Sequence, residues 1–180
     1  MVDRSFPRLV SLACHDLRTP LATVFGFART LQRSDDLDER SARFVGMIEE
    51  ASEQMTELLD ILGTAARIAA GRWEPVLREV DTLELVDGAT GTGETIATDV
   101  DTVRASLRSL ATAAQRHGPV ESVSWTVAGR ELRLEPVTSE AAPVVLGEDE
   151  KDLGALVARL VIEELGGSLE LSGAVLTVRV

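Results

Sequence analysis

His15 is the side chain in this 180-residue chain whose type and placement most favour chemistry. A neutral imidazole is a nucleophile near neutral pH. The adjacent Asp16 is close enough to influence the ring, Arg18 flanks it, and Thr19 shares its face if the segment is helical. Helix geometry alone leaves a second interpretation equally open, namely an ordinary solvated helix face that happens to carry a histidine.

The other candidates for chemistry are better explained by structure. Cys14, His15 and Asp16 cannot form a catalytic triad, because consecutive helix residues diverge by about 100°. Cys14 is instead expected to pack beside the apolar stripe of its helix. His117 falls at the end of a predicted helix, where a positive charge suits the helix dipole. The glycine-rich stretch 88–93 lacks the ending of a phosphate-binding loop and is interpreted as a turn.

Composition and charge restrict the possible functions. The chain has 18 basic and 30 acidic residues, a formal net charge of −12, which argues against a nucleic-acid or anionic-membrane surface. Its single cysteine excludes a disulfide framework and a cysteine-based zinc site. No stretch approaches the roughly 20 apolar residues of a membrane span. A hydrophobic share of 44% suffices for a packed core. We therefore expect a soluble, cytoplasmic protein.

Two long stretches in the first 70 residues have the periodicity of amphipathic helices. In each, apolar residues recur at steps of three and four, which places them on one stripe. The first stripe comprises Val10, Ala13, Leu17, Leu21, Val24, Ala28 and Leu31, and the second comprises Phe44, Ile48, Ala51, Met55, Leu58 or Leu59, Leu62, Ala65 and Ala69. The polar segment 33–39 between them supplies aspartates suited to capping the second helix. Residues 1–70 are thus predicted to form an antiparallel helical hairpin.

A single hairpin cannot cover both stripes, because each helix then buries only one neighbour. Two hairpins paired into a four-helix bundle solve this, so we predict a two-fold homodimer. The alternative is a hairpin that packs against the second half of its own chain. His15 lies roughly 155° around the helix from the stripe and should therefore face solvent. On the same face, the small residues Ala22, Thr23, Gly26 and Thr30 leave a shallow patch that a partner could approach.

The second half is predicted to be a separate α/β domain. The segment GRWEP at 71–75 marks a linker, which we extend to residues 71–78. Helices are expected at 79–88, 101–116 and 150–165, and strands at 94–99, 119–128, 130–137, 168–172 and 174–180. Strands collected on one face of the helices give a two-layer α/β sandwich over residues 79–180.

The segment SLACHDLRTPL at 11–21 resembles the H-box of bacterial sensor histidine kinases, H-E/D-x-R-T-P-L. The resemblance implies that His15 accepts a phosphoryl group and passes it to an aspartate of a response regulator. It also implies that Asp16 orients the ring and accepts its proton, and that Thr19 aligns water when a regulator is dephosphorylated, with Arg18 in the same motif. A response-regulator receiver domain would then dock beside Thr19 on Ala22, Thr23, Gly26, Phe27 and Thr30, and on Met47, Glu50, Ala51 and Gln54 of the facing helix.

The second half resembles the ATP-binding (Bergerat) domain of the same kinases but differs where nucleotide and metal would bind. In the helix 101–118, Ser109 and Ala113 replace the two asparagines of the N-box, and alanine has no oxygen to offer magnesium. The glycine-rich adenine box is missing after the strand 130–137. Asp152 stands where a phosphate-binding glycine is usual, and a carboxylate there would repel phosphate. We therefore expect no bound ATP or metal, and magnesium supplied by the partner receiver domain.

These resemblances imply a histidine-containing phosphotransfer protein of a two-component phosphorelay, in which His15 moves phosphoryl groups between receiver domains. Two alternatives remain open. One is an ATP-dependent histidine kinase core, and the other is a module that binds a response regulator without accepting phosphate.

Overall fold

The computed structural model describes residues 5–33 and 37–180, which divide into two compact units, Met1–Gly71 and Arg72–Val180. The first unit is a pair of long helices, and the second is a mixed α/β domain. None of the helices in the two described ranges has both the length and the hydropathy of a membrane span.

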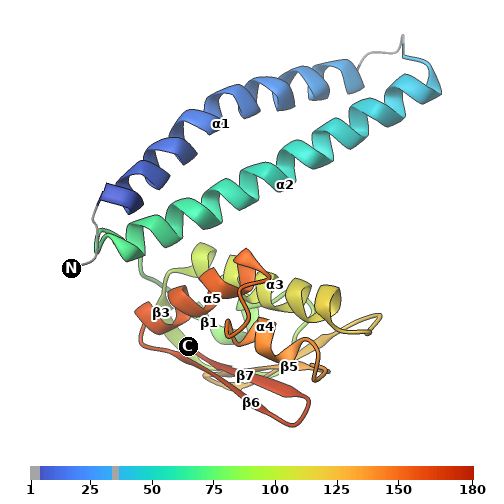
Figure 1. Ribbon diagram of the computed structural model, residues 1–180. Helices are drawn as coiled ribbons and strands as arrows, with labels where there is room; N and C mark the ends of the chain where they lie inside the picture. The colour runs from blue at the N-terminus through green and yellow to red at the C-terminus, as the bar shows by residue number, and fades with distance from the viewer. Residues whose placement is uncertain (1–4, 34–36) are drawn as a thin grey trace. The chain divides into compact units, whose positions relative to one another are not determined.

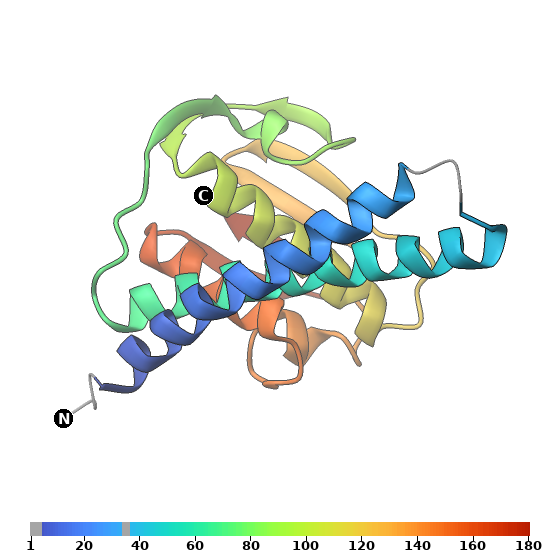
Figure 2. The same ribbon diagram turned by 90° about the horizontal axis from the view of Figure 1, so that it is seen from above.

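The first unit consists of two antiparallel helices, α1 (Ser5–Gln32) and α2 (Glu39–Ala69), which lie side by side in both views (Figure 1, Figure 2). Asp38 caps α2 as the aspartate-rich break predicts, since its Oδ1 accepts a hydrogen bond of 2.8 Å from the Ser41 amide. This hydrogen bond lowers the pKa of Asp38, because the ionised carboxylate is the better acceptor. Residues 34–36 of the predicted polar break lie outside the described part.

Small side chains occupy most buried positions of the hairpin. The buried residues include Cys14, Ala28, Val45, Ser52, Gly63 and Ala66. Cys14 is only 2% exposed, which confirms that it packs. The large residues of the predicted stripes stay exposed, among them Leu17, Val24, Leu31, Phe44, Ile48, Met55 and Leu58. The hairpin therefore leaves much of both stripes uncovered, as expected for a single copy.

The second unit is described throughout and contains two sheets. Its strands are β1 (Arg78–Asp81), β2 (Thr90–Gly93), β3 (Thr95–Thr98), β4 (Ser124–Gly129), β5 (Glu131–Glu135), β6 (Ser168–Ser172) and β7 (Val175–Arg179). Its helices are α3 (Val100–His117), α4 (Ala142–Val145) and α5 (Leu153–Glu164), with a 3₁₀ turn η1 at Thr82–Leu85. β1 pairs antiparallel with β3, and the larger sheet has the order β2-β4-β5-β7-β6, in which only the β2–β4 pair is parallel.

One hydrophobic core joins the larger sheet to α3 and α5, which cover one of its faces (Figure 1). Alternate strand residues point into this core, as the two-residue period of a strand requires. The inward residues are Trp125, Val127, Leu132, Leu134, Leu176 and Val178 from the strands, with Val103, Leu107 and Leu110 from α3 and Ala158 and Ile162 from α5. The predicted two-layer α/β sandwich is confirmed.

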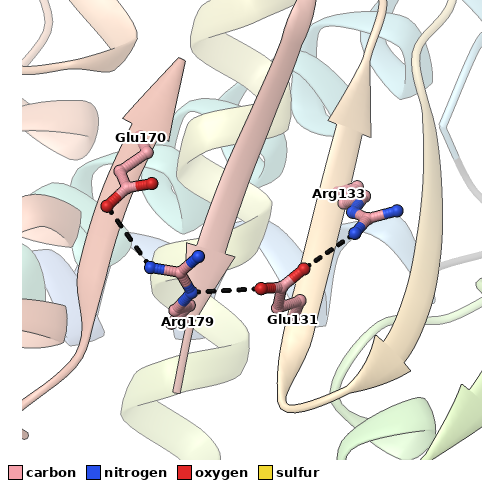
Figure 3. Close-up of polar contacts among 4 residues, drawn as sticks. All are labelled: Glu131, Arg133, Glu170 and Arg179. Atoms are coloured by element: carbon pink, nitrogen blue, oxygen red, sulfur yellow. Dashed lines mark hydrogen bonds and ion pairs between the residues drawn. The ribbon is translucent and has the colours of Figure 1, made fainter. Parts of the chain in front are cut away.

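A chain of ion pairs crosses the opposite face of the sheet (Figure 3). Glu131 of β5 accepts hydrogen bonds from Arg133 Nη2 at 2.8 Å and from Arg179 Nε at 3.1 Å. Arg179 of β7 also reaches Glu170 of β6, at 3.3 Å. The hydrogen bonds from Arg133 and Arg179 lower the pKa of Glu131, and the bond to Glu131 raises the pKa of Arg179. These pairs link three neighbouring strands on the face that α3 and α5 leave open.

Two local predictions are wrong. The segment 79–88 is not a helix, because its first residues form β1 and Thr82–Leu85 form the 3₁₀ turn. Pairing with β3 outweighs the local helical pattern there. The stretch 88–93, interpreted as a turn, ends in strand β2, which pairs with β4. Gly91 permits this pairing, since at its φ of 123° a side chain would overlap the carbonyl oxygen of Val127.

Candidate phospho-acceptor site

His15 lies in the first half of α1, and its side chain is 78% exposed. Its Nδ1 is 3.1 Å from Oδ1 of Asp16, whose side chain is also exposed. An ionised carboxylate can only accept a hydrogen bond, so Nδ1 carries the proton and the lone pair is on Nε2. The ring therefore faces solvent as predicted, and its nucleophilic nitrogen is the one that Asp16 does not contact.

Arg18, one turn after His15, contacts the second helix. Its Nη2 donates to Oδ1 of Asp60 at 2.6 Å, which joins α1 to α2. Gly63 lies beside the guanidinium, since a Cβ there would be in ordinary van der Waals contact with Arg18 Nη2, at 3.6 Å. Sequence reasoning missed Asp60, because the pattern of apolar residues does not fix the register of two helices whose partners are 42 positions apart. Arg18 thus links the two helices on the surface of the hairpin, in addition to any role at His15.

The residues predicted for partner docking all lie on the surface of the hairpin. They are Ala22, Thr23, Gly26, Phe27, Thr30, Met47, Glu50, Ala51 and Gln54, and each is exposed. We call these nine residues the docking patch. Phe27 and Met47 are 68% and 60% exposed, and exposed apolar side chains of this size are typical of an interaction surface.

Two hydroxyl groups of the patch are bonded to the backbone of α1. Thr23 Oγ1 donates to the carbonyl oxygen of the exposed Thr19 at 3.1 Å, and Thr30 Oγ1 donates to that of Gly26 at 2.7 Å. Such bonds hold the hydroxyls close to the helix. The side chain of Thr19, predicted to align water, is exposed and lies one turn from His15.

In the second unit, the residues that stand in place of the nucleotide-binding motifs pack within the domain. Ala113 of α3 is fully buried in the core. Ser109 packs against Gly154 of α5, where a Cβ would come within 3.1 Å of the serine side chain. The segment in place of the adenine box contains α4, which the sequence analysis did not predict. Its Val144 and Val145 are 2% and 0% exposed.

Asp152 caps α5 with a carboxylate that is 7% exposed. Its Oδ1 accepts a hydrogen bond from the Ala155 amide at 3.0 Å, and its Oδ2 lies 3.1 Å from Arg116 Nη1 and 3.3 Å from His117 Nε2. His117 was predicted only as a charge at a helix end, and its partner 35 positions away carries no local signal. Within residues 5–33 and 37–180, no group of three or more histidine, cysteine or carboxylate side chains is placed to hold a metal ion.

Comparison with known proteins agrees with this arrangement. Residues 8–71 match the family model described as "His Kinase A (phospho-acceptor) domain". The sensor protein KdpD of Mycobacterium tuberculosis is 30% identical over 203 aligned residues, which cover 89% of this chain and 24% of KdpD. The chain spans between 9% and 24% of the length of the curated relatives that it matches.

Two solved structures share the fold. Full-length ShkA, crystallised in complex with AMPPNP, superposes with a TM-score of 0.65 at 21% identity, over 96% of this chain and 44% of that chain. The histidine kinase AdeS of Acinetobacter baumannii gives a TM-score of 0.55 at 17% identity, over 92% of this chain and 96% of that chain. Together with the phospho-acceptor match over α1 and α2, these likenesses identify a sensor histidine kinase-like core, in which a helical hairpin bearing His15 is followed by an α/β domain.

Proposed function

We propose that the chain is a histidine-containing phosphotransfer protein, which relays phosphoryl groups between response-regulator receiver domains through His15. The observation that carries this proposal is the exposed ring of His15, whose Nδ1 bonds to Asp16 so that Nε2 can attack. The match of residues 8–71 to a phospho-acceptor domain supports the same role for this histidine.

Transfer begins from a receiver that is phosphorylated on an aspartate. The lone pair of His15 Nε2 attacks phosphorus, and the N–P bond forms as the bond from phosphorus to the aspartyl oxygen breaks. The receiver's carboxylate leaves with the electron pair. The ring then carries a positive charge with its proton still on Nδ1, and Asp16 stabilises that charge through its hydrogen bond. Attack by the aspartate of a second receiver reverses these changes and restores the neutral ring.

The docking patch would hold the receiver while this exchange takes place. Phosphoryl transfer depends chiefly on in-line positioning, so a rigid helix face beside His15 suits it. Magnesium would come with the receiver, which supplies the phosphorylated aspartate. The exposed large residues of the two stripes would be covered by a second copy of the chain, which makes the active form a homodimer.

The residues of the second domain do not fit a nucleotide with its magnesium. Ala113 offers no ligand and lies in the core, α4 stands in the segment where the adenine box would follow β5, and the start of α5 is already bonded to Asp152. These three features support phosphorylated receivers, and not ATP, as the source of the phosphoryl group.

An ATP-dependent histidine kinase core is the second candidate. The alignment with the sensor protein KdpD over 89% of this chain favours it, because that alignment includes the second domain as well as the hairpin. In this case, ATP alone would label His15. A third possibility is a module that binds a receiver without accepting phosphate, and its binding would not need the imidazole.

The decisive experiment is phosphotransfer profiling with a panel of receiver domains that carry labelled phosphate, beside a reaction with labelled ATP alone. The relay predicts rapid label transfer from at least one receiver, none from ATP, and none to His15→Ala. The chain has two histidines, so label on His15→Ala would point to His117 and contradict the assignment. Labelling by ATP would support the kinase, whereas unlabelled binding that survives His15→Ala would support the module.

A further inference from the structure

We infer that Asp152 is a built-in anion, whose carboxylate occupies the start of α5 in place of a phosphate group and so keeps external phosphate out of the second domain. The inference rests on the proposed function in one respect, because it gives the physical reason why ATP would not be the donor. It also makes Asp152 one of the residues that determine this specificity.

Three donors converge on this carboxylate. The Ala155 amide, 3.0 Å from Oδ1, is one of the N–H groups at the start of α5 that have no partner within the helix. Arg116 Nη1 and His117 Nε2, at the end of α3, lie 3.1 Å and 3.3 Å from Oδ2. A helix N-terminus together with side-chain N–H donors, an arginine among them, is a combination of groups that binds phosphate oxygens in proteins. Here all three donors already contact an anion, which is the carboxylate of Asp152.

Close packing holds the carboxylate in this position. The side chain of Asp152 is 7% exposed, whereas those of Arg116 and His117 are 65% and 22% exposed. Gly154 brings α5 against Ser109 of α3, and a Cβ at Gly154 would lie 3.2 Å from Asp152 Oδ1. The donors can thus be approached from solvent on the side of Arg116, but their acceptor is enclosed by the two helices.

An external phosphate would have to compete with an anion on the same chain. A tethered ligand acts at an effective concentration in the millimolar range or above, so a free anion must bind more tightly or be far more concentrated to displace it. A phosphate that approached without displacing Asp152 would meet the negative charge of the carboxylate. Both effects exclude the phosphate chain of a nucleotide, whatever holds its base.

Removing the carboxylate should create a phosphate site. The probe is inorganic triphosphate, measured by isothermal titration calorimetry and by the shift in melting temperature of the full chain. Asp152→Asn keeps a helix-capping side chain without the charge, and Asp152→Ala empties the position. Each variant should bind triphosphate at least about tenfold more tightly than the wild type, because the donors regain a charged acceptor only from the ligand.

Asp149→Asn is the matched control. It removes the same charge three positions earlier, from a carboxylate that pairs with Lys151 at 2.6 Å and not with Arg116 or His117. This variant should bind triphosphate no better than the wild type. An equal gain in Asp149→Asn would mean that only the net charge of the domain matters, and would overturn the inference.

Two further outcomes would also overturn it. One is wild-type protein that binds triphosphate as tightly as the variants, and the other is an Asp152→Asn protein, folded by circular dichroism, that shows no gain. Transfer from a phosphorylated receiver to His15 is measured on the same samples. Absence of that transfer in the wild type counts against the proposed function alone, while transfer without any gain in triphosphate binding counts against the role of Asp152 alone.

Discussion

At the scale of single residues, the two histidines of the chain differ in which ring nitrogen contacts an aspartate and in how exposed the ring is. His15 contacts Asp16 through Nδ1, and the exposed ring keeps Nε2 open to a partner. His117 contacts the buried Asp152 through Nε2, and its side chain is only 22% exposed. A histidine beside an aspartate is thus not by itself a candidate phospho-acceptor. Exposure and an uncontacted Nε2 distinguish His15.

Replacing Asp16 with asparagine should slow phosphotransfer without unfolding the hairpin. The amide is neutral, so it stabilises the positive charge of the phosphorylated ring less well and no longer forces the proton onto Nδ1. We expect the transfer rate to fall by about tenfold or more. The measurement is rapid-quench transfer from a phosphorylated receiver, with the melting temperature unchanged because Asp16 is exposed. Glu121→Gln, an exposed acid of the second unit, is the control, and equal rates in both variants would contradict this role of Asp16.

At the scale of elements, one aspartate fixes the start of α3 to the segment before β1. Oδ1 of Asp99 accepts a hydrogen bond from the Thr102 amide at 3.1 Å, and Oδ2 accepts one from the Val76 amide at 2.9 Å. Burial alone would raise the pKa of Asp99, but these hydrogen bonds outweigh it and lower the pKa below its ordinary value of 3.8. Two neighbouring segments therefore depend on a single ionised carboxylate.

Asp99→Ala should destabilise the second domain by about 1–3 kcal/mol, because it removes the helix cap and the hydrogen bond that the Val76 amide donates to Asp99. The lowered pKa sets the pH dependence. Stability from the ionised form is fully present above 3.8 and is lost as the pH falls through the lower pKa of the folded protein. The free energies of unfolding of the wild type and of Asp99→Ala, measured in urea at several pH values, should therefore converge at acid pH.

Asp101→Ala is the comparison for this prediction, since it removes a carboxylate two positions away. Asp101 is 80% exposed and pairs with Arg78, at 2.6 Å. Exposed ion pairs contribute less than about 1 kcal/mol. If Asp101→Ala lost as much stability as Asp99→Ala, the negative charge near the start of α3 would explain the effect, and not the two hydrogen bonds from backbone amides to Asp99.

The elements differ in how well the sequence alone predicts them. The long helices α1 and α2 follow from a local periodicity, and Asp38 from its place before α2. The error at 79–88 arose because β1 exists only through its pairing with β3. The residues of the candidate site also differ in how well the sequence predicts them. His15 and Asp16 are adjacent in sequence, whereas Asp60 and the partners of Asp152 reach their positions through tertiary packing, which a pattern of residue types does not contain.

At the scale of the whole molecule, the hairpin has two kinds of exposed apolar residue. The docking patch includes Phe27, which is 68% exposed, and the predicted stripe of α1 includes Val24, which is 47% exposed. These two positions are three residues apart, so they lie only about 60° apart around the helix, whereas Gly26 of the docking patch lies about 160° from Val24. Val24 and Gly26 therefore allow self-association and receiver docking to be tested separately on one helix.

Val24→Glu should convert the proposed homodimer into a monomer. By two-fold symmetry the substitution occurs twice in the interface, and each copy would bury a charge without a partner, so we expect the dimer to weaken by about 100-fold or more. Light scattering after size-exclusion chromatography measures the mass. Gly26→Glu should remain a dimer but lose receiver binding, because position 26 is exposed and belongs to the docking patch. A dimeric Val24→Glu beside a monomeric Gly26→Glu would show that the two faces have been assigned the wrong way round, since the same charge was placed on each.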